Sequence, residues 1–367
     1  MQTGSLSNHA RAGLVFSGAS LMASIKPADV DGAKNGAVGK RRVPIRGKVA
    51  PKLPPVHHAS ICSGPRSEPL PAAFVDTIAK LESELGMDVW LLIQGDDDND
   101  HAAFASINVE MLDAFRAHKK QMPQKEIALI IDSPGGDADA AYQLAMLLRR
   151  RCGGFTAIVP RWAKSAATLL SLAGKAIYLG DDGQLGALDA QVMDRDKEEK
   201  YVSALDDVGA IEELEERAME AAVASLFFMQ QRTKKKLNVL MPYVFDFVAK
   251  LHQPLFDKID SIRFSRMCRT LSVAEKYAIM LLQPRFSEQE AGRIARDLVK
   301  TFPSHRFAID IEHARKISPR HKDAPILVSP PPDRIRPIMD DLYPMLGGSF
   351  KAIGRIQEVS HEEQISS

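Results

Sequence analysis

Two short apolar stretches, each ending in a tight turn followed by helical sequence, constrain this chain most. ALIIDSPGGDADAA leads from the first stretch into Gly135 and Gly136, and AIVPRWAKSAATLLSLAG leads from the second into Ser165. Paired glycines after a strand let backbone N–H groups turn outward, and such donors at the start of a helix stabilise a developing oxyanion. A serine at the next strand-to-helix turn is the natural nucleophile. The pattern therefore predicts acyl chemistry.

Neither turn is specific on its own. Ser-Pro-Gly-Gly is a common turn whose glycines supply a positive φ for local reasons, and a serine at a helix start is commonly an N-cap. The order along the chain is more specific: strand, glycine pair, helix, strand, serine, helix, then a third strand at Lys175–Leu179 and the turn segment QLGALDAQ. This combination favours a catalytic site.

Three segments, D-SPGG-D-A-AYQLA, VPRWAKSAATLLSLAGKAIYL and QLGALDAQV, cover most of about Ile127–Gln191, and the last of them ends at Val192. Together they resemble the serine dehydrogenase proteinase family, a branch of the Clp protease and crotonase superfamily that is related to signal peptide peptidase A. A weaker similarity covers Thr301–Lys316. The resemblance implies a Clp/crotonase-like α/β fold, a ββα-superhelix with a mainly parallel sheet, here with an additional helical C-terminal portion. It also implies a serine hydrolase, namely a peptidase, without a cofactor.

The same resemblance assigns the oxyanion hole to backbone groups. A backbone N–H from Gly135 or Gly136 and the N–H of Ala166 would point at the tetrahedral oxygen. Asp137, just after the glycine pair, is expected to be a helix N-terminal residue favoured by the helix dipole rather than an acid catalyst.

Three positions depart from the family's pattern. Ser165-Ala166-Ala167 replaces Ser-Gly-Gly or Ser-Ala-Gly, Asp189-Ala190-Gln191 replaces Asp-Pro-Gln, and Lys164 occupies a place that is more often apolar or small. Alanine after the serine removes some freedom for a substrate backbone to approach closely. The alternative is a catalytically silent member of the superfamily that serves as an oligomeric scaffold or peptide-binding protein.

A serine hydroxyl needs a base to take its proton. The Clp branch would place a histidine in the turn where this chain has Asp189. The remaining candidates are His305, which precedes a predicted strand at Phe307–Ile311, and Lys197 or Lys200, which would form a Ser–Lys dyad. A lysine base needs burial, whereas both lysines lie in the charged run DRDKEEK, which is typical of a solvated face. His305 is therefore favoured, and Asp189 either orients the base or caps a loop.

Composition indicates an ordinary soluble globular protein. The 367 residues are 45% hydrophobic and 26% charged, and the net charge of +1 gives no argument for binding nucleic acid. The three cysteines are odd in number and widely spaced, which predicts reduced thiols in the cytoplasm and no metal site. No stretch reaches the ~18–20 apolar residues of a membrane span. We expect a cytoplasmic protein that acts on peptide or protein substrates.

The chain divides into three parts. Residues 1–68 are rich in Gly, Ser, Ala, Pro and Lys and are expected to be disordered or loosely attached. Residues 69–318 form the predicted hydrolase domain with its outer helices, and 319–367 a Pro-rich connector and C-terminal tail. Alternating helix and strand patterns from Ala72–Leu85 to Ile127–Ile131 predict a right-handed, mainly parallel α/β domain.

One long helix is predicted over Ala210–Leu237, with an acidic start and a basic end. Its apolar centre, which includes Phe227, Phe228 and Met229, is expected to pack against the core or another subunit. Because superfamily relatives associate through outer helices, we expect a homo-oligomer of at least three subunits. Further helices are predicted at Tyr243–Asp260 and Glu288–Lys300.

Overall fold

A six-stranded sheet carries the two turns singled out by the sequence. The computed structural model describes residues 56–63, 68–95, 104–189, 191–194, 200–302, 304, 307–319 and 325–359. Most of the predicted N-terminal segment 1–68, together with Lys197 and His305, therefore lies outside the described residues. The 53–367 portion forms one compact unit.

The strand order in the sheet is β2-β11-β3-β4-β5-β7. The strands are β1 Val56–Ala59, β2 Cys62–Ser63, β3 Asp88–Ile93, β4 Ile127–Asp132, β5 Phe155–Val159, β6 Trp162–Ala163, β7 Ala176–Leu179, β8 Gln184–Leu185, β9 Gln191–Asp194, β10 Lys200–Ser203, β11 Ala352–Gly354 and β12 Ile356–Val359. Strands β3, β4, β5 and β7 pair in parallel, and β11 is antiparallel to both neighbours. The predicted mainly parallel α/β sheet is thus confirmed.

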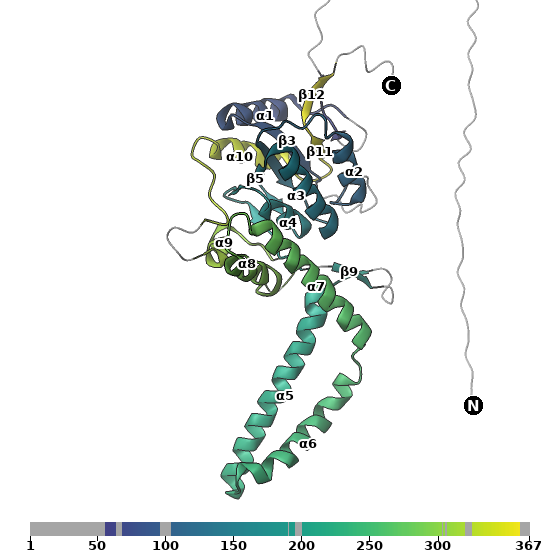
Figure 1. Cartoon of the computed structure of the whole chain (residues 1–367), viewed down its shortest axis with the longest axis vertical. Coiled ribbons are helices and arrows are strands. Elements are labelled where there is room, and N and C mark those ends of the chain that lie inside the picture. Colours follow the sequence, from purple (N-terminus) through teal and green to yellow (C-terminus); the bar gives the residue numbers. More distant parts are fainter. Residues whose placement is uncertain are drawn as a thin grey trace, which may run out of the picture. The chain divides into compact units, whose positions relative to one another are not determined.

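Helices cover both faces of this sheet (Figure 1). The helices are α1 Ala72–Leu85, α2 Val109–Ala117, α3 Ala138–Cys152, α4 Ala166–Leu172, α5 Ala204–Thr233, α6 Leu237–Phe256, α7 Ser261–Leu282, α8 Glu288–Lys300, α9 Ile311–Ile317 and α10 Arg336–Leu342, followed by the 3₁₀ turn η1 Tyr343–Met345. Along β3, Trp90 and Leu92 pack in the core shared with α2 and α3, whereas Val89 and Leu91 pack in the core shared with α1 and α10. This alternation follows from the two-residue period of a strand.

Both ends of the described chain contribute to the sheet. The sequence predicts a connector and tail over 319–367, but α10 packs in the core beside α1, and β11 lies between β2 and β3. β12 pairs with β1, within the predicted loose segment 1–68. These short strands carry too few residues to show a period of their own, so only their long-range partners define them.

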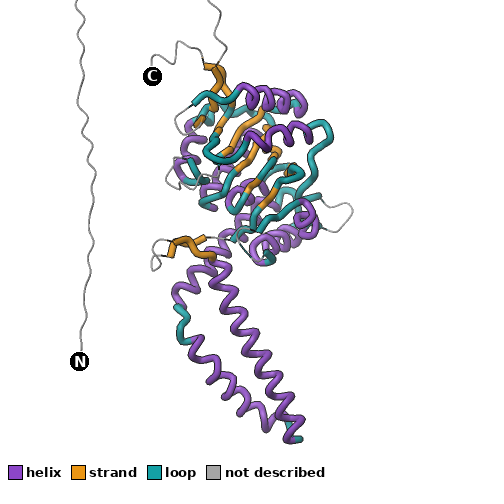
Figure 2. Tube along the Cα trace, turned by 180° about the vertical axis from the view of Figure 1, so that it is seen from behind, coloured by secondary structure: helices purple, strands orange, loops and turns teal. Residues whose placement is uncertain are grey.

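The predicted long helix over Ala210–Leu237 is confirmed as α5, which begins earlier, at Ala204, and ends at Thr233. Its C-cap Lys234 adopts a left-handed φ of 57°, and α6 begins at Leu237. α5 and α6 run side by side away from the sheet (Figures 1 and 2) and share a small core of Ala222, Val244 and Val248. Over the described ranges, no helix combines the length and apolar character needed to cross a membrane.

The predicted strand over Phe307–Ile311 is wrong. Only Ile309 forms a bridge, to Leu185, and α9 begins at Ile311. The Asp310 carboxylate accepts the backbone N–H of His313 and so caps α9, which ends the extended conformation. The predicted helix Glu288–Lys300 is confirmed as α8, with a capping box between Ser287 and Glu290.

Candidate active site

Ser165 lies at the sharp turn between β6 and α4. Its backbone has φ 48° and ψ −118°, a region that residues with a Cβ rarely adopt. Although Ser165 occupies the N-cap position of α4, its side chain makes no capping hydrogen bond within the described residues. The hydroxyl is therefore not used as a cap, and the strain resembles that of a nucleophile on a strand-to-helix turn.

The glycine turn packs directly on the serine turn. A Cβ placed on Gly135, whose φ is +102°, would lie 2.5 Å from the Lys164 carbonyl oxygen and 2.9 Å from the Ser165 Cβ. On Gly136, with φ +140°, a Cβ would lie 2.2 Å from the Ile107 carbonyl oxygen. Both positions require glycine for its backbone conformation and for the lack of space.

Backbone pairing brings the two turns together. The Ser133 N–H donates to the Trp162 carbonyl at 3.2 Å, and the Lys164 N–H donates to the Ser133 carbonyl at 3.0 Å. The chain just after β4 thus pairs with β6, which in turn pairs in parallel with β8. Parallel strands end at the same edge of a sheet, so Gly135 and Ser165 meet there.

The two glycine amides differ in their bonding. The Gly135 N–H donates to the Ser133 hydroxyl oxygen at 3.0 Å, and that hydroxyl donates to the Gln94 side-chain oxygen. Neither the Gly136 N–H nor the Ala166 N–H donates a hydrogen bond to any residue that the structure describes. Of the predicted donors, Gly136 and Ala166 are therefore the amides that remain for a ligand, while Gly135 holds the turn.

An ion pair between Arg161 and the buried carboxylate of Asp132 connects the two segments that lead into the turns. Arg161 donates two hydrogen bonds to the Asp132 carboxylate, both at 2.9 Å, and the carboxylate is fully buried. The guanidinium also lies 4.5 Å above the ring of Trp162. Such a two-point contact fixes the end of β4 relative to the segment between β5 and β6.

Lys164, the residue directly before Ser165, binds the neighbouring strand β8. Its ammonium donates to the Gln184 side-chain oxygen at 2.9 Å and to the Leu185 carbonyl at 3.3 Å. The side chain is half-buried, and this burial lowers the pKa of Lys164. A Cβ on Gly186 would lie 3.0 Å from the Ser165 amide nitrogen. β8 and the following Gly186 therefore also contact the serine turn.

Comparison with known proteins finds a similar family. Residues 102–250, less than half of the chain, match the family described as ClpP-like SDH-type serine proteinases. This part of the chain is similar to that family. The match includes the glycine turn, Ser165 and Asp189, so the resemblance seen in the motifs is confirmed there. The late segment around His305 lies beyond it.

Two proteins from Methanocaldococcus jannaschii are similar in sequence to this chain. The chain is 25% identical over 208 residues to the uncharacterized protein MJ0137, covering 57% of this chain and 56% of the relative. It is 36% identical over 83 residues to the uncharacterized protein MJ1495, covering 23% and 27%. The chain thus spans about half of the first relative and about a quarter of the second.

Among solved structures, two mutant forms of the 1510-N membrane-bound stomatin-specific protease are similar. One covers 40% of this chain and 66% of its own, with 16% identity and a TM-score of 0.24. The other, in complex with a substrate peptide, covers 71% and 92%, with 13% identity and a TM-score of 0.36.

Asp189 is buried and binds the start of α5. One carboxylate oxygen accepts the Leu205 N–H at 3.0 Å, next to the Ser203 hydroxyl that accepts the Asp206 N–H at 2.9 Å. The sequence predicts that Asp189 either orients the base or caps a loop. The structure shows a capping contact, made to the first turn of α5.

The candidate bases are only partly described. His305 and Lys197 fall outside the described residues, and of Lys200 the structure gives the backbone, in β10 opposite Asp194. The late segment does reach the site, because Ile309 and Leu185 exchange two backbone hydrogen bonds of 3.0 and 2.9 Å. It therefore lies along β8, one strand from the serine turn.

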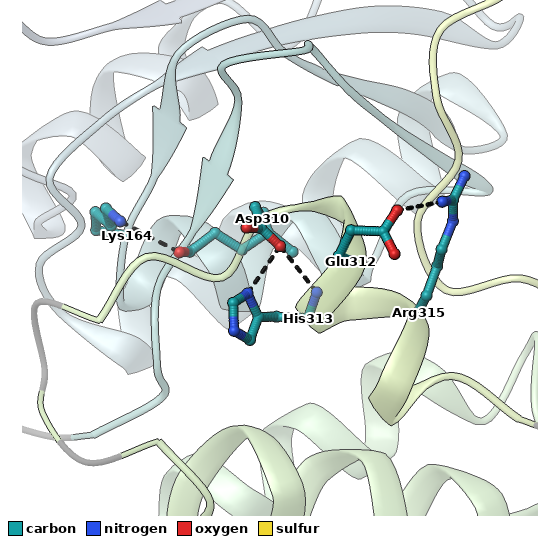
Figure 3. A network of polar contacts seen from close by, with 6 residues as sticks. Lys164, Asp310, Glu312, His313 and Arg315 are labelled. Atoms are coloured by element: carbon teal, nitrogen blue, oxygen red, sulfur yellow. Dashed lines mark hydrogen bonds and ion pairs between the residues drawn. The ribbon is translucent and has the colours of Figure 1, made fainter.

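A second histidine of this late segment was not predicted. The His313 Nδ1 lies 2.8 Å from the Asp310 carboxylate, which also accepts the His313 backbone N–H at 2.9 Å (Figure 3). That backbone hydrogen bond lowers the pKa of Asp310. The ring packs edge-on against Phe307, with 5.1 Å between centroids. The Asp-x-x-His spacing at a helix start was the signal available in the sequence.

Within the described residues, no group of three or more His, Cys, Asp or Glu side chains could hold a metal ion. The site is therefore built from backbone amides, one hydroxyl and the residues that position them.

Proposed function

We propose that this protein is a serine peptidase that cleaves peptide bonds through an acyl-enzyme on Ser165. The strained Ser165 backbone, with its hydroxyl not used as a cap and packed against Gly135, is the observation that carries the proposal. Similarity to a serine proteinase family supports the reaction class.

The reaction would begin with attack of the Ser165 Oγ on the substrate carbonyl carbon as a base removes the hydroxyl proton. The resulting oxyanion would accept hydrogen bonds from the Gly136 and Ala166 amides. Such donors are worth about 2.7–4 kcal/mol of barrier each in well-studied proteases. The base would then protonate the leaving amine, and water would hydrolyse the acyl-enzyme.

His305 remains our proposed base, with Lys200 as the lysine alternative. The structure adds His313, since a carboxylate on Nδ1 fixes the ring as in a Ser-His-Asp triad. We propose that Asp189 orients the base. One of its oxygens already binds the Leu205 N–H, which would hold the carboxylate in place.

We also propose a cytoplasmic homo-oligomer that acts on peptide or protein substrates, uses no cofactor and binds no nucleic acid. The three cysteines are free thiols, as expected in a reducing compartment.

Labelling with a fluorophosphonate probe, followed by peptide mapping, tests the nucleophile. The adduct should form on Ser165 and disappear in Ser165→Ala. Ser171→Ala is the matched control, because Ser171 lies on the same helix with its hydroxyl bound to the Ala167 carbonyl at 2.8 Å. It should keep the adduct.

The second candidate function is a catalytically silent scaffold or peptide-binding protein. It is favoured by Asp189 in the turn where the Clp branch has a histidine, and by Ala166-Ala167 after the serine. A folded protein that forms no adduct, yet binds peptides, would establish this candidate instead.

A further inference from the structure

One face of α5 carries a regular repeat. Six residues alternate in spacing by four and three positions, which places them along one seam of a helix. Five of them, Glu216, Glu220, Val223, Phe227 and Gln230, lie on α5, and the sixth, Lys234, follows as its C-cap with a left-handed φ of 57°; all six are exposed. Val223 and Phe227 are 60% and 64% exposed and, with Met219, line an open groove. A seam with this spacing is typical of helices that pair with another helix.

The partner helix in the same chain does not cover this seam. α6 packs on a different face of α5, through Ala222, Val244 and Val248. Phe227 and Val223 thus remain on the surface over the described residues. Two large apolar side chains one turn apart on a projecting helix indicate an interaction surface.

The charges on the seam are ordered. The acidic residues Glu216 and Glu220 precede the apolar pair, and Gln230 and Lys234 follow it. Glu216, Glu220 and Lys234 have no ion-pair partner among the described residues. The two acids that precede the seam are paired: Glu212 with Lys300 at 3.6 Å and Glu213 with Arg217 at 3.0 Å.

We propose that α5 pairs antiparallel with α5 of a second copy of this chain. In the register where Val223 of one copy faces Phe227 of the other, Glu220 faces Gln230 and Glu216 faces Lys234. Two-fold symmetry makes each of these contacts twice. Two copies of the seam are thus complementary when they run antiparallel: apolar residues meet in the middle, and opposite charges meet at each end.

The apolar contacts supply the affinity and the charges set the register. Four apolar side chains leave water at the centre, whereas exposed ion pairs add little energy and mainly exclude wrong alignments. The acidic half of the seam disfavours an anionic lipid surface, which would attract only the basic end. Like-directed pairing would set Glu216 against Glu216, so the charges also select the antiparallel arrangement.

This inference gives an interface to the proposed homo-oligomer and does not depend on catalysis by Ser165. We expect at least three subunits, and an assembly built from pairs has an even number of subunits. The assembly would therefore contain at least four subunits. Its test measures association alone, so a failure here is separable from a failure of the peptidase proposal.

The experiment exchanges charges across the proposed contact in the full chain. Glu216→Lys and Lys234→Glu should each weaken pairing at least about tenfold, measured by sedimentation velocity at micromolar concentration, because each variant sets two pairs of like charges together. An equimolar mixture of the two variants should recover pairing, since the mixed pair sets opposite charges together at both ends. Glu215→Lys, about 100° around the helix from Glu216, is the matched control and should pair normally.

Three results would overturn the inference: a wild-type chain that stays monomeric, variants that pair as the wild type does, or a mixture that fails to recover. Wild-type monomers that co-float with vesicles containing phosphatidylserine would assign the exposed helices to a lipid surface instead. Since every changed side chain is exposed, circular dichroism should show the same helix content in all variants.

Discussion

Gly135 packs so closely on Ser165 that a Cβ at position 135 would lie 2.9 Å from the Ser165 Cβ. The glycine turn and the serine turn are therefore in direct contact, although 30 positions separate Gly135 and Ser165 in the sequence. Any change that moves one turn moves the other, and the amides of Gly136 and Ala166 keep their relative positions only while this contact holds.

Gly135→Ala should therefore destabilise the fold and remove the site. We expect a loss of about 3 kcal/mol in unfolding free energy, because the new Cβ meets backbone atoms as well as an unfavourable φ. Gly153→Ala is the control: its φ is +65°, but no described atom lies within 4 Å of the added Cβ. It should cost only about 1 kcal/mol. Urea unfolding of both variants measures the difference, and equal losses would contradict the close contact.

The strain at Ser165 has its own test. Ser165→Gly and Ser165→Ala both remove the hydroxyl and should lower any hydrolytic rate by several orders of magnitude. Glycine adopts φ 48° and ψ −118° without a Cβ clash. The glycine variant should therefore be more stable than the alanine variant by about 1 kcal/mol. A glycine variant less stable than the alanine variant would show that the turn is not strained.

Lys164 should make stability depend on pH in the alkaline range. Burial lowers the pKa of Lys164 from its ordinary 10.5, so the folded protein binds that proton less tightly than the unfolded chain does. Stability therefore rises with pH between the lowered pKa and 10.5. Lys164→Met should lack this rise. Denaturant unfolding at pH 7 and near pH 10 measures it, and identical pH dependence in the two proteins would show that Lys164 does not contribute.

The base can be found by a panel of three variants. If His305 is the base, activity should rise as an imidazole loses its proton, near pH ~6.5 for an unperturbed side chain, and His305→Gln should lose it. His313→Gln and Lys200→Met should then keep nearly normal rates. Rates measured from pH 6 to 9 separate the cases, and normal activity in His305→Gln would exclude that residue.

The two turns could be predicted because their signals are local. Glycine needs no partner to reveal a positive φ, and the apolar runs of β4 and β5 are buried on both faces of the sheet, so they are continuous in sequence. The serine and glycine turns were placed together by the family resemblance. Which of the two glycine amides is hydrogen-bonded could not be predicted, because it depends on Ser133 and on Gln94, which follows β3 and lies 39 positions earlier in the sequence.

The differences elsewhere have the same physical origin. Lys234 ends α5 in a left-handed conformation, yet lysine is a good helix former, so no local preference marks the break. Phe307 to Ile311 alternates like a strand, but Asp310 starts a helix there. β11 has three residues, and its place in the sheet is defined only by partners on β2 and β3.

The position of β11 has a consequence for biosynthesis. A ribosome makes β3 early and β11 only after α1 to α10 have emerged, so the backbone groups on one side of β3 wait unpaired for most of translation. An open strand edge invites pairing with other nascent chains. Emergence of β11, rather than formation of the serine turn, therefore completes this edge and ends that exposure.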